Sequence, residues 1–247
     1  MNFAVLLSVL FIAFSMPAYA ELSDIKQSMS PRELNVWKSR IPRYTKQYDE
    51  LLKEIYKNPD IIKDKVPLLR SYYPLTQQYQ PFSKEILDKI AAHAMVLDST
   101  SDNEIINDAL ASYNGLIRKH LMNFDVASFA LTMARLDGRF GDEFFYKKIR
   151  DTLIKTFNRD GMGTRSETAY NILSYGEETY VLEHIAKKIE SSEIFEVRKK
   201  YYNVHEIINN DGNYKQIFMN VTQPIKNIFY NKAIEEQKNK TPLRPIQ

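Results

Sequence analysis

The clearest structural signal in this chain is SKEILDKIAAHAMVLDSTSDNEIINDALASYNGLI, residues 83–117. Apolar residues recur in it at intervals of three and four, which is the spacing of a helix with one buried face. Ser83 stands before the first apolar run, and residues 101–104 (SDNE) form a capping box before the second. Because the connection between the two runs is short, we expect two antiparallel helices that pack as a hairpin.

A second pair of helical patterns follows directly. Residues 125–136 carry Phe129 and Met133 on one face, and residues 142–157 repeat the pattern after Asp137-Gly138. The two pairs begin about 40 residues apart, which is longer than the repeat of about 34 residues in tetratricopeptide proteins. We therefore expect a tetratricopeptide-like, repeat-like stack of hairpins.

The segment before residue 83 is also predicted to be largely helical. Ser30 and Glu33 form a capping box, with Pro31 at the first helical position. The pattern then predicts an interruption at Pro42, a second helix over 43–57 ended by Asn58-Pro59, a partly helical stretch over 60–70 and an aromatic loop over 71–81.

The pattern changes after Gly163. Residues 169–175 (AYNILSY) predict a strand and residues 176–189 a helix, while 201–209 and 213–221 flank an Asn-Asp-Gly turn as a hairpin. We therefore predict an α+β, mainly α fold. Its parts are a helical-hairpin region over 21–158, a small antiparallel sheet with one helix over 159–231, and a flexible polar tail over 232–247.

The N-terminus predicts export. Residues 3–16 are almost all apolar, Pro17 ends the run, and Ala18-Tyr19-Ala20 supplies the small residues that signal peptidase requires. We expect a signal peptide over 1–20, cleaved between Ala20 and Glu21, with no transmembrane anchor afterwards. An uncleaved anchor is the alternative, but the apolar run is short for a span of about 20 residues. A chain exported without cysteine fits the bacterial periplasm, so we expect it to be periplasmic or secreted.

Composition excludes several function classes. The 247 residues carry a formal net charge of +3, which is too small to indicate nucleic-acid binding. The chain contains no phosphate-binding G-x-x-x-x-G-K and no G-x-S-x-G motif. The absence of cysteine removes thiolate zinc sites and cysteine nucleophiles. We expect no cofactor, no metal and no nucleic-acid partner.

An aromatic segment is the first candidate binding surface. Tyr72, Tyr73 and Tyr79 lie near Arg70 in a segment that also contains prolines. Tyrosine rings offer contact area together with a polar group, which suits recognition of a partner. Packing of the same rings in the core is the favoured interpretation, and binding remains the alternative.

Charged residues give weaker signals. Glu177 and Glu178 begin the predicted helix over 176–189, where carboxylates complement the helix dipole. An acid–base pair is the less favoured interpretation, since adjacent helical residues point about 100° apart. Residues 198–202 (RKKYY) place three cations before two aromatics, which could grip single-stranded nucleic acid or an anionic surface, although a solvated charge run is favoured. His205-Glu206 begins an incomplete zinc-protease motif on a predicted strand, so zinc is not expected.

Several segments together resemble a known family. They are DELLKE at 49–54, LRSYY at 69–73, QYQPF at 78–82, DG at 160–161, SETAYNILS at 166–174, Glu178 with YVL at 180–182, and QIFMNV at 216–221. Their order and spacing resemble the bacterial domain-of-unknown-function family numbered four-nine-one-nine. The resemblance implies an exported chain with a tetratricopeptide-like helical half and a small α+β end, and it supplies no activity. Among the matching residues are Arg70, Tyr72, Tyr73, Glu167, Tyr170 and Glu178.

The leading functional expectation is a non-enzymatic periplasmic protein-interaction module whose partner is an unidentified envelope protein. Stacked helical hairpins commonly present concave binding surfaces, and the tyrosines around Tyr72 and Tyr170 would supply contact area. The alternative is an envelope hydrolase or transferase that uses the carboxylates of Glu167 and Glu178 near Tyr170. That alternative requires the chain to fold back so that the two carboxylates converge.

Overall fold

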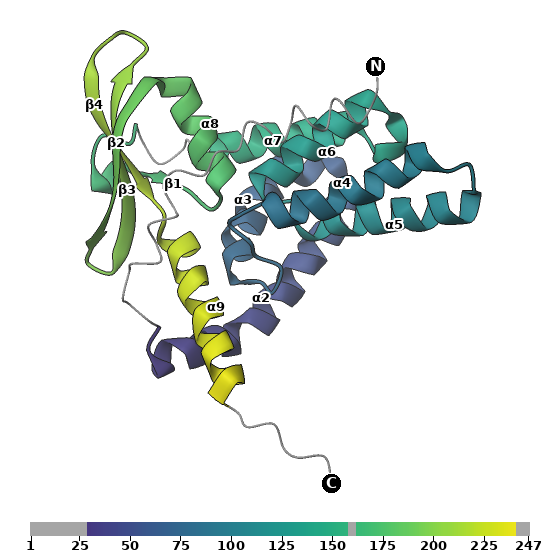
Figure 1. Ribbon diagram of the computed structural model, residues 1–247, viewed down its shortest axis with the longest axis horizontal. Coiled ribbons are helices and arrows are strands. Elements are labelled where there is room, and N and C mark those ends of the chain that lie inside the picture. The colour runs from purple at the N-terminus through teal and green to yellow at the C-terminus, as the bar shows by residue number, and fades with distance from the viewer. Residues whose placement is uncertain (1–28, 158–161, 241–247) are drawn as a thin grey trace.

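The computed structural model describes residues 29–157 and 162–240. The predicted signal peptide, its cleavage site at Ala20 and Glu21, and the Asp160-Gly161 turn lie outside the described residues. From residue 31 the chain forms a series of helices, then a four-stranded sheet, then a final helix (Figure 1). This is the predicted α+β, mainly α fold.

The first part of the described chain is helical. Its helices are α2 (Pro31–Lys57), α3 (Ile62–Tyr72), α4 (Lys84–Ser99), α5 (Asn103–Lys119), α6 (Phe124–Leu136) and α7 (Glu143–Phe157). Short 3-10 helices at Pro59–Ile61, Tyr73–Leu75 and Gly138–Phe140 connect some of them. The pairs α4–α5 and α6–α7 each pack as a hairpin, which confirms the two predicted hairpins (Figure 1).

Helix α2 shows where local rules hold and where packing overrides them. The Ser30 hydroxyl accepts from the Glu33 N–H at 3.3 Å, so the predicted capping box is present. The predicted interruption at Pro42 is wrong, because α2 continues through it. A proline inside a helix removes one hydrogen bond and costs about 3 kcal/mol. Burial of Ile41 and Tyr48 on either side of Pro42 offsets that cost and keeps α2 continuous.

The sheet is mixed, not purely antiparallel as predicted. Its order is β1-β4-β3-β2, with β1 (Tyr170–Asn171) parallel to β4 (Tyr214–Asn220), and β3 (Lys200–Asn209) antiparallel to both β4 and β2 (Ala186–Val197). The predicted strand over 169–175 is reduced to the two residues of β1, and its last residue, Tyr175, begins α8 (Tyr175–Ile185). The predicted helix over 176–189 ends early, and its last residues open β2. Strand β2 lies at the sheet edge with mostly exposed side chains, so its sequence lacks a strong apolar alternation.

The predicted flexible tail is helical as far as it is described. Helix α9 (Thr222–Lys240) covers the residues from 232 to 240 that were expected to be flexible, and residues 241–247 lie outside the described part. Its Phe229 ring meets Tyr201 of β3 at 5.9 Å, and its Tyr230 stacks on Trp37 of α2 at 5.5 Å. Two helices, α8 and α9, therefore contact the sheet where one was expected.

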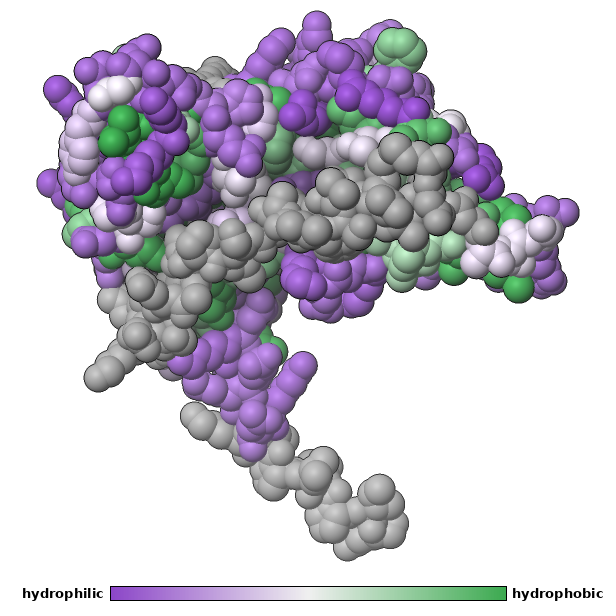
Figure 2. Space-filling view, turned by 45° about the horizontal axis from the view of Figure 1, so that its top comes forward, coloured by the Kyte–Doolittle hydropathy of each residue, from purple (hydrophilic) through white to green (hydrophobic). Residues whose placement is uncertain are grey.

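One hydrophobic core joins the helical region to the sheet. Buried residues from Tyr48 in α2 to Phe229 in α9 form a continuous cluster that includes Ile207 and Ile217 of the sheet. A smaller cluster lies on the other face of the sheet. Helix α8 stands between the sheet and the helical hairpins (Figure 1). On the face shown in Figure 2 the surface is mostly hydrophilic, and apolar residues are scattered over it.

Candidate functional site

The aromatic segment lies mainly in the core. Tyr73 is fully buried and Tyr79 is nearly so, with its hydroxyl donating to the Leu173 carbonyl at 2.8 Å. Tyr72 is half-buried, and its ring lies 5.3 Å from that of Tyr44. These contacts support the favoured core interpretation for Tyr73 and Tyr79, and they leave Tyr72 as the partly accessible member.

A buried ion pair joins α3 to the start of α8. Arg70 Nε and Nη2 donate to the two carboxylate oxygens of Glu177 at 3.2 and 2.7 Å, and the Glu177 side chain is 0% exposed. Nη2 also donates to the Asn171 carbonyl at 2.5 Å, and the Leu173 N–H donates to Glu177 Oε2 at 2.7 Å. Glu177 is therefore an internal anchor of the fold, and the positive charge of Arg70 is already compensated.

The next residue, Glu178, contacts a different set of side chains. Its Oε1 accepts from Asn203 Nδ2 at 2.6 Å and lies 3.0 Å from His205 Nε2. The other ring nitrogen of His205, Nδ1, lies 2.7 Å from the Ser192 hydroxyl of β2. Adjacent helical carboxylates thus serve two separate clusters, as the expected angle between them requires. The helix-dipole interpretation describes their place in the first turn and misses their burial.

Glu167 and Glu178 do not form a pair. Glu167 is exposed in the 3-10 helix Ser166–Thr168 and lines a hollow together with Tyr202 of β3. Glu178 contacts Asn203, the next residue of the same strand. Because successive strand residues point to opposite faces of a sheet, the two carboxylates lie on opposite faces. Tyr170, also expected nearby, is half-buried and packs under Gly163, where a Cβ would collide with the ring.

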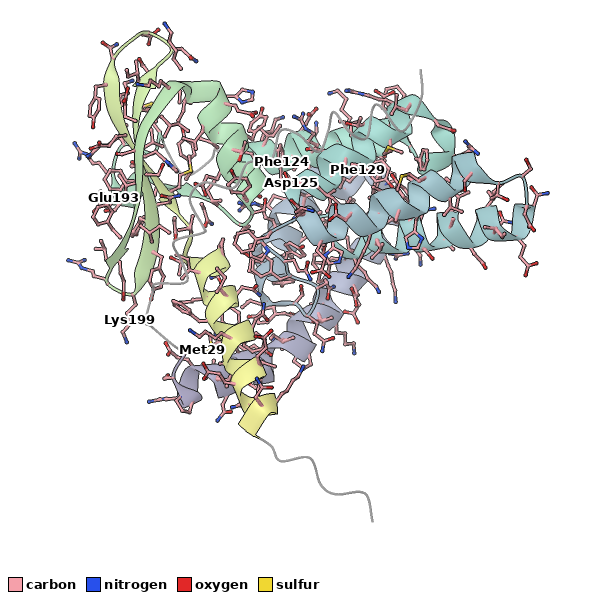
Figure 3. The ribbon with its side chains drawn as sticks, viewed as in Figure 1. Met29, Phe124, Asp125, Phe129, Glu193 and Lys199 are labelled. Atoms are coloured by element: carbon pink, nitrogen blue, oxygen red, sulfur yellow. The ribbon has the colours of Figure 1, made fainter. Side chains whose placement is uncertain are left out.

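A third buried group links α6 to α8. The Ser83 hydroxyl donates to the Asp125 carboxylate, which explains why Ser83 does not cap its own helix. A Cβ at position 176 would overlap this carboxylate, so the close approach of α8 requires glycine there. Burial raises the pKa of Asp125 to about 6, the Ser83 hydrogen bond opposes the rise, and the nearby Glu177 adds to it. Figure 3 shows Asp125 close to the start of α8.

A cationic cleft lies on the surface beside these buried groups. It has a volume of about 560 Å³ and opens between α3, the β2–β3 turn and the start of α9. Lys199, Lys200 and Lys226 line it together with polar groups that include Asn220 and Thr222. No acidic residue of the described chain lines this cleft, and none of the three lysines forms an ion pair with a described residue. Lys199 lies at the end of the sheet near α9 (Figure 3).

The turn that carries these lysines is strained. Arg198 and Lys199 have positive φ values of 52° and 64°, and Val197 pairs with Lys200 across the two-residue turn. Such turns favour Asn-Gly, because a side chain in this conformation costs about 1 kcal/mol per residue. Strained residues cluster at functional sites. The sequence therefore keeps two cations at positions where Asn and Gly would be more stable.

Carboxylates lie near this cleft but not in it. Glu33 and Glu196 share a neighbouring hollow of about 220 Å³ with Lys199 and Lys226. The pKa of Glu33 is lowered mainly by hydrogen bonds from Ser30, and then by Lys226 and Lys199. On the other side, Lys200 also lines the hollow of about 620 Å³ that contains Glu167 and Arg198. The central cleft brings the three lysines together, and these carboxylates line the neighbouring hollows.

Sequence reasoning found part of this site. The RKKYY segment is visible in the sequence as three cations followed by two aromatics, although this pattern alone favours a solvated charge run. The contribution of Lys226 was missed, because no sequence signal for α9 had been recognised. The contacts of Ser192 and His205 were missed as well, since β2 was assigned in part to a helix. The pairing of the two residues follows only from the register of β2 against β3.

In the described ranges 29–157 and 162–240, no group of three potential metal-ligating residues converges, and no helix is long and apolar enough to cross a membrane. No family model matches the chain, and neither a curated protein nor a solved structure matches it significantly. The functional argument accordingly rests on the geometry of the chain itself.

Proposed function

We propose that this chain is an exported, periplasmic binding module that recognises an anionic partner in the cleft lined by Lys199, Lys200 and Lys226. The observation that carries the proposal is this cleft of about 560 Å³, which is lined by three lysines that form no ion pair with a described residue and by no described carboxylate. The apolar N-terminal run over 3–16 supports export. An envelope protein with acidic or phosphorylated groups is the expected partner.

The lining of the cleft suits an anion in two ways. Lysine binds phosphate and carboxylate groups as a mobile point charge with three donors. Thr222 and Gln223, at the beginning of α9, add polar groups where the helix dipole is positive. Arg70 also lines the cleft, but Glu177 neutralises it, so the net attraction comes from the lysines.

The proposed binding surface is the lysine cleft and not the tyrosine segment expected from the sequence. The tyrosine segment supplies little accessible area, because Tyr73 and Tyr79 are buried. The strained turn at Arg198 and Lys199 indicates instead a surface where stability is reduced and charge is kept. The interaction-module hypothesis is therefore retained with a different contact surface.

The proposal is tested by isothermal titration of the full chain with inorganic pyrophosphate at about 20 mM and about 200 mM salt. Each lysine contact contributes about 1 kcal/mol, so replacing all three with glutamine should weaken binding about 100-fold. The matched control replaces Lys84, Lys89 and Lys147, which lie on α4 and α7 in exposed ion pairs, with glutamine. The control variant carries the same net charge and should bind as the wild type does.

Equal weakening in the two triple variants would mean that pyrophosphate responds only to net charge, which would overturn the proposed site. Absence of binding to the wild type at low salt would overturn it as well. Weaker binding at high salt is required, because exposed charges are screened within about 10 Å at 0.1 M.

A further inference from the structure

We propose that Ser192 is the nucleophile of an acyl-ester hydrolysing site, with His205 as general base and Glu178 as the residue that orients the imidazole. The three side chains form an unbroken series. Ser192 Oγ lies 2.7 Å from His205 Nδ1, and His205 Nε2 lies 3.0 Å from Glu178 Oε1. A nucleophile within hydrogen-bond reach of a base, and a base oriented by a third group, are the signature of nucleophilic catalysis by serine.

The direction of the hydrogen bonds between these three side chains follows from the partners of Glu178. Its Oε1 receives the Asn203 Nδ2 donor at 2.6 Å as well as His205 Nε2. An ionised carboxylate only accepts, so Nε2 carries the imidazole proton and Nδ1 has a free lone pair. The Ser192 hydroxyl therefore donates to Nδ1, which is the arrangement required for removal of its proton.

Exposure increases from Glu178 and His205 to Ser192, as expected for a nucleophile that must meet its substrate. Glu178 and His205 are each 2% exposed in their side chains, whereas Ser192 is half-buried. Ser192 lies on β2, the edge strand, and alternate backbone N–H groups of an edge strand face away from the sheet. Those amides can donate to the oxygen of a bound acyl group. The register of β2 is irregular between Ile189 and Ser191, and such bulges are frequent beside active sites.

Asn203 supplies a further polar atom beside the series. It is fully buried, and its Oδ1 has no hydrogen-bond partner among the described residues. Leaving a buried acceptor unsatisfied is costly in a core that serves packing alone. A water molecule inside the protein would satisfy this oxygen beside the series.

The chemistry balances with water as the second reactant. Ser192 Oγ attacks the carbonyl carbon of a carboxylic ester while its proton passes to His205 Nδ1. The bond to the leaving oxygen breaks, and that oxygen takes the proton from Nδ1 as the alcohol departs. Water then attacks the acyl-serine, gives a proton to Nδ1, and the carboxylic acid leaves as Oγ regains that proton. Glu178 stays ionised throughout and holds the ring.

This inference is independent of the proposed anion site, because Ser192, His205 and Glu178 do not line the lysine cleft. It is tested with the full chain and a fluorophosphonate probe, with the modified residue identified by mass spectrometry. Ser192 should be labelled, and His205→Gln or Glu178→Gln should slow labelling about 100-fold or more. The matched control is Ser191→Ala, since the Ser191 hydroxyl donates to Glu206 at 2.8 Å and forms no hydrogen bond with a histidine of the described chain.

A second variant avoids disturbing the buried partners. The chain has no cysteine, so Ser192→Cys introduces a unique thiol that can be compared with the one in Ser191→Cys. A thiol beside an imidazole ionises more readily. At about pH 6, where an ordinary thiol of pKa about 8.5 is protonated, Ser192→Cys should react with iodoacetamide at least about 10-fold faster. Equal alkylation of the two thiols, or an unlabelled Ser192 in the folded wild type, would overturn the assignment.

Discussion

Removing one member of the Arg70–Glu177 pair should be among the most destabilising single changes in this chain. Both side chains are almost fully buried, at 7% and 0% exposure, and two hydrogen bonds join them. In Arg70→Met, the Glu177 carboxylate loses both Arg70 donors and keeps the hydrogen bond from the Leu173 N–H. Leaving a buried charge without its partner costs about 3–5 kcal/mol, a large part of the 5–15 kcal/mol that stabilises a typical domain.

A second substitution tests whether the loss of stability comes from the unpaired charge or from the changed shape of the side chain. Glu177→Gln removes the negative charge and nearly preserves volume, so it should cost about 2–4 kcal/mol alone. The double variant contains neither charge, and it should be no less stable than Arg70→Met. The free energies of unfolding would then be far from additive, with a coupling of at least about 2 kcal/mol.

Urea unfolding followed by circular dichroism measures these free energies at neutral pH. Lys84→Met is the surface control, because its pair with Asp88 is exposed at 72% and 45% and should contribute less than about 1 kcal/mol. A cost below about 1 kcal/mol for Arg70→Met, or additive costs in the double variant, would refute the role of this pair as an anchor.

Three further predictions concern pH, the turn and the N-terminus. Burial raises the pKa of Asp125 from 3.8 to about 6 and lowers that of His120 from 6.5 to about 4. With rising pH the Asp125 contribution to stability therefore falls and the His120 contribution rises, by about 3 kcal/mol each. The two contributions nearly cancel in the wild type. Urea unfolding between pH 4 and 6.5 should show that the free energy of unfolding rises with pH in Asp125→Asn and falls with pH in His120→Asn. Parallel pH dependences in the two variants would contradict this. Replacing Arg198 by Asn and Lys199 by Gly should raise the free energy of unfolding by about 1–2 kcal/mol while weakening pyrophosphate binding, and a loss of stability would count against a strained turn. Sequencing of the chain isolated from its host should give Glu21 as the first residue, whereas an intact N-terminus would contradict export.

The sequence predicted the elements whose signals are local. The capping box at Ser30 and the apolar spacing over 83–117 depend on neighbours within a few residues, and the structure confirms both. The hairpin of β3 and β4 was predicted in the same way from alternation around Asn210-Asp211-Gly212. Local propensity and tertiary structure agree at these positions.

The errors arose where tertiary packing decides. Pro42 remains inside α2, because the flanking residues are held in the core. Strand β2 has the charged composition of a solvent-facing helix and becomes a strand only by pairing with β3. The start of α9 is fixed by contacts with β3, so Lys226 could not be assigned to the cleft.

The candidate sites were less predictable than the fold. The sequence separated Glu177 from Glu178 by their angle on a helix, which the structure supports. It could not show that Glu178 faces His205 and Ser192, since these residues come from three elements. This convergence depends on the register in which the strands pair and on how the chain connects the elements, and local sequence patterns specify neither.

The most direct test of the central claim is a crystal structure of the full chain grown with pyrophosphate at low ionic strength. The account predicts both phosphate groups in the cleft, with oxygens about 2.8 Å from the Nζ atoms of Lys199, Lys200 or Lys226. Pyrophosphate bound at another surface, or an empty cleft in crystals where solution binding has been measured, would contradict it.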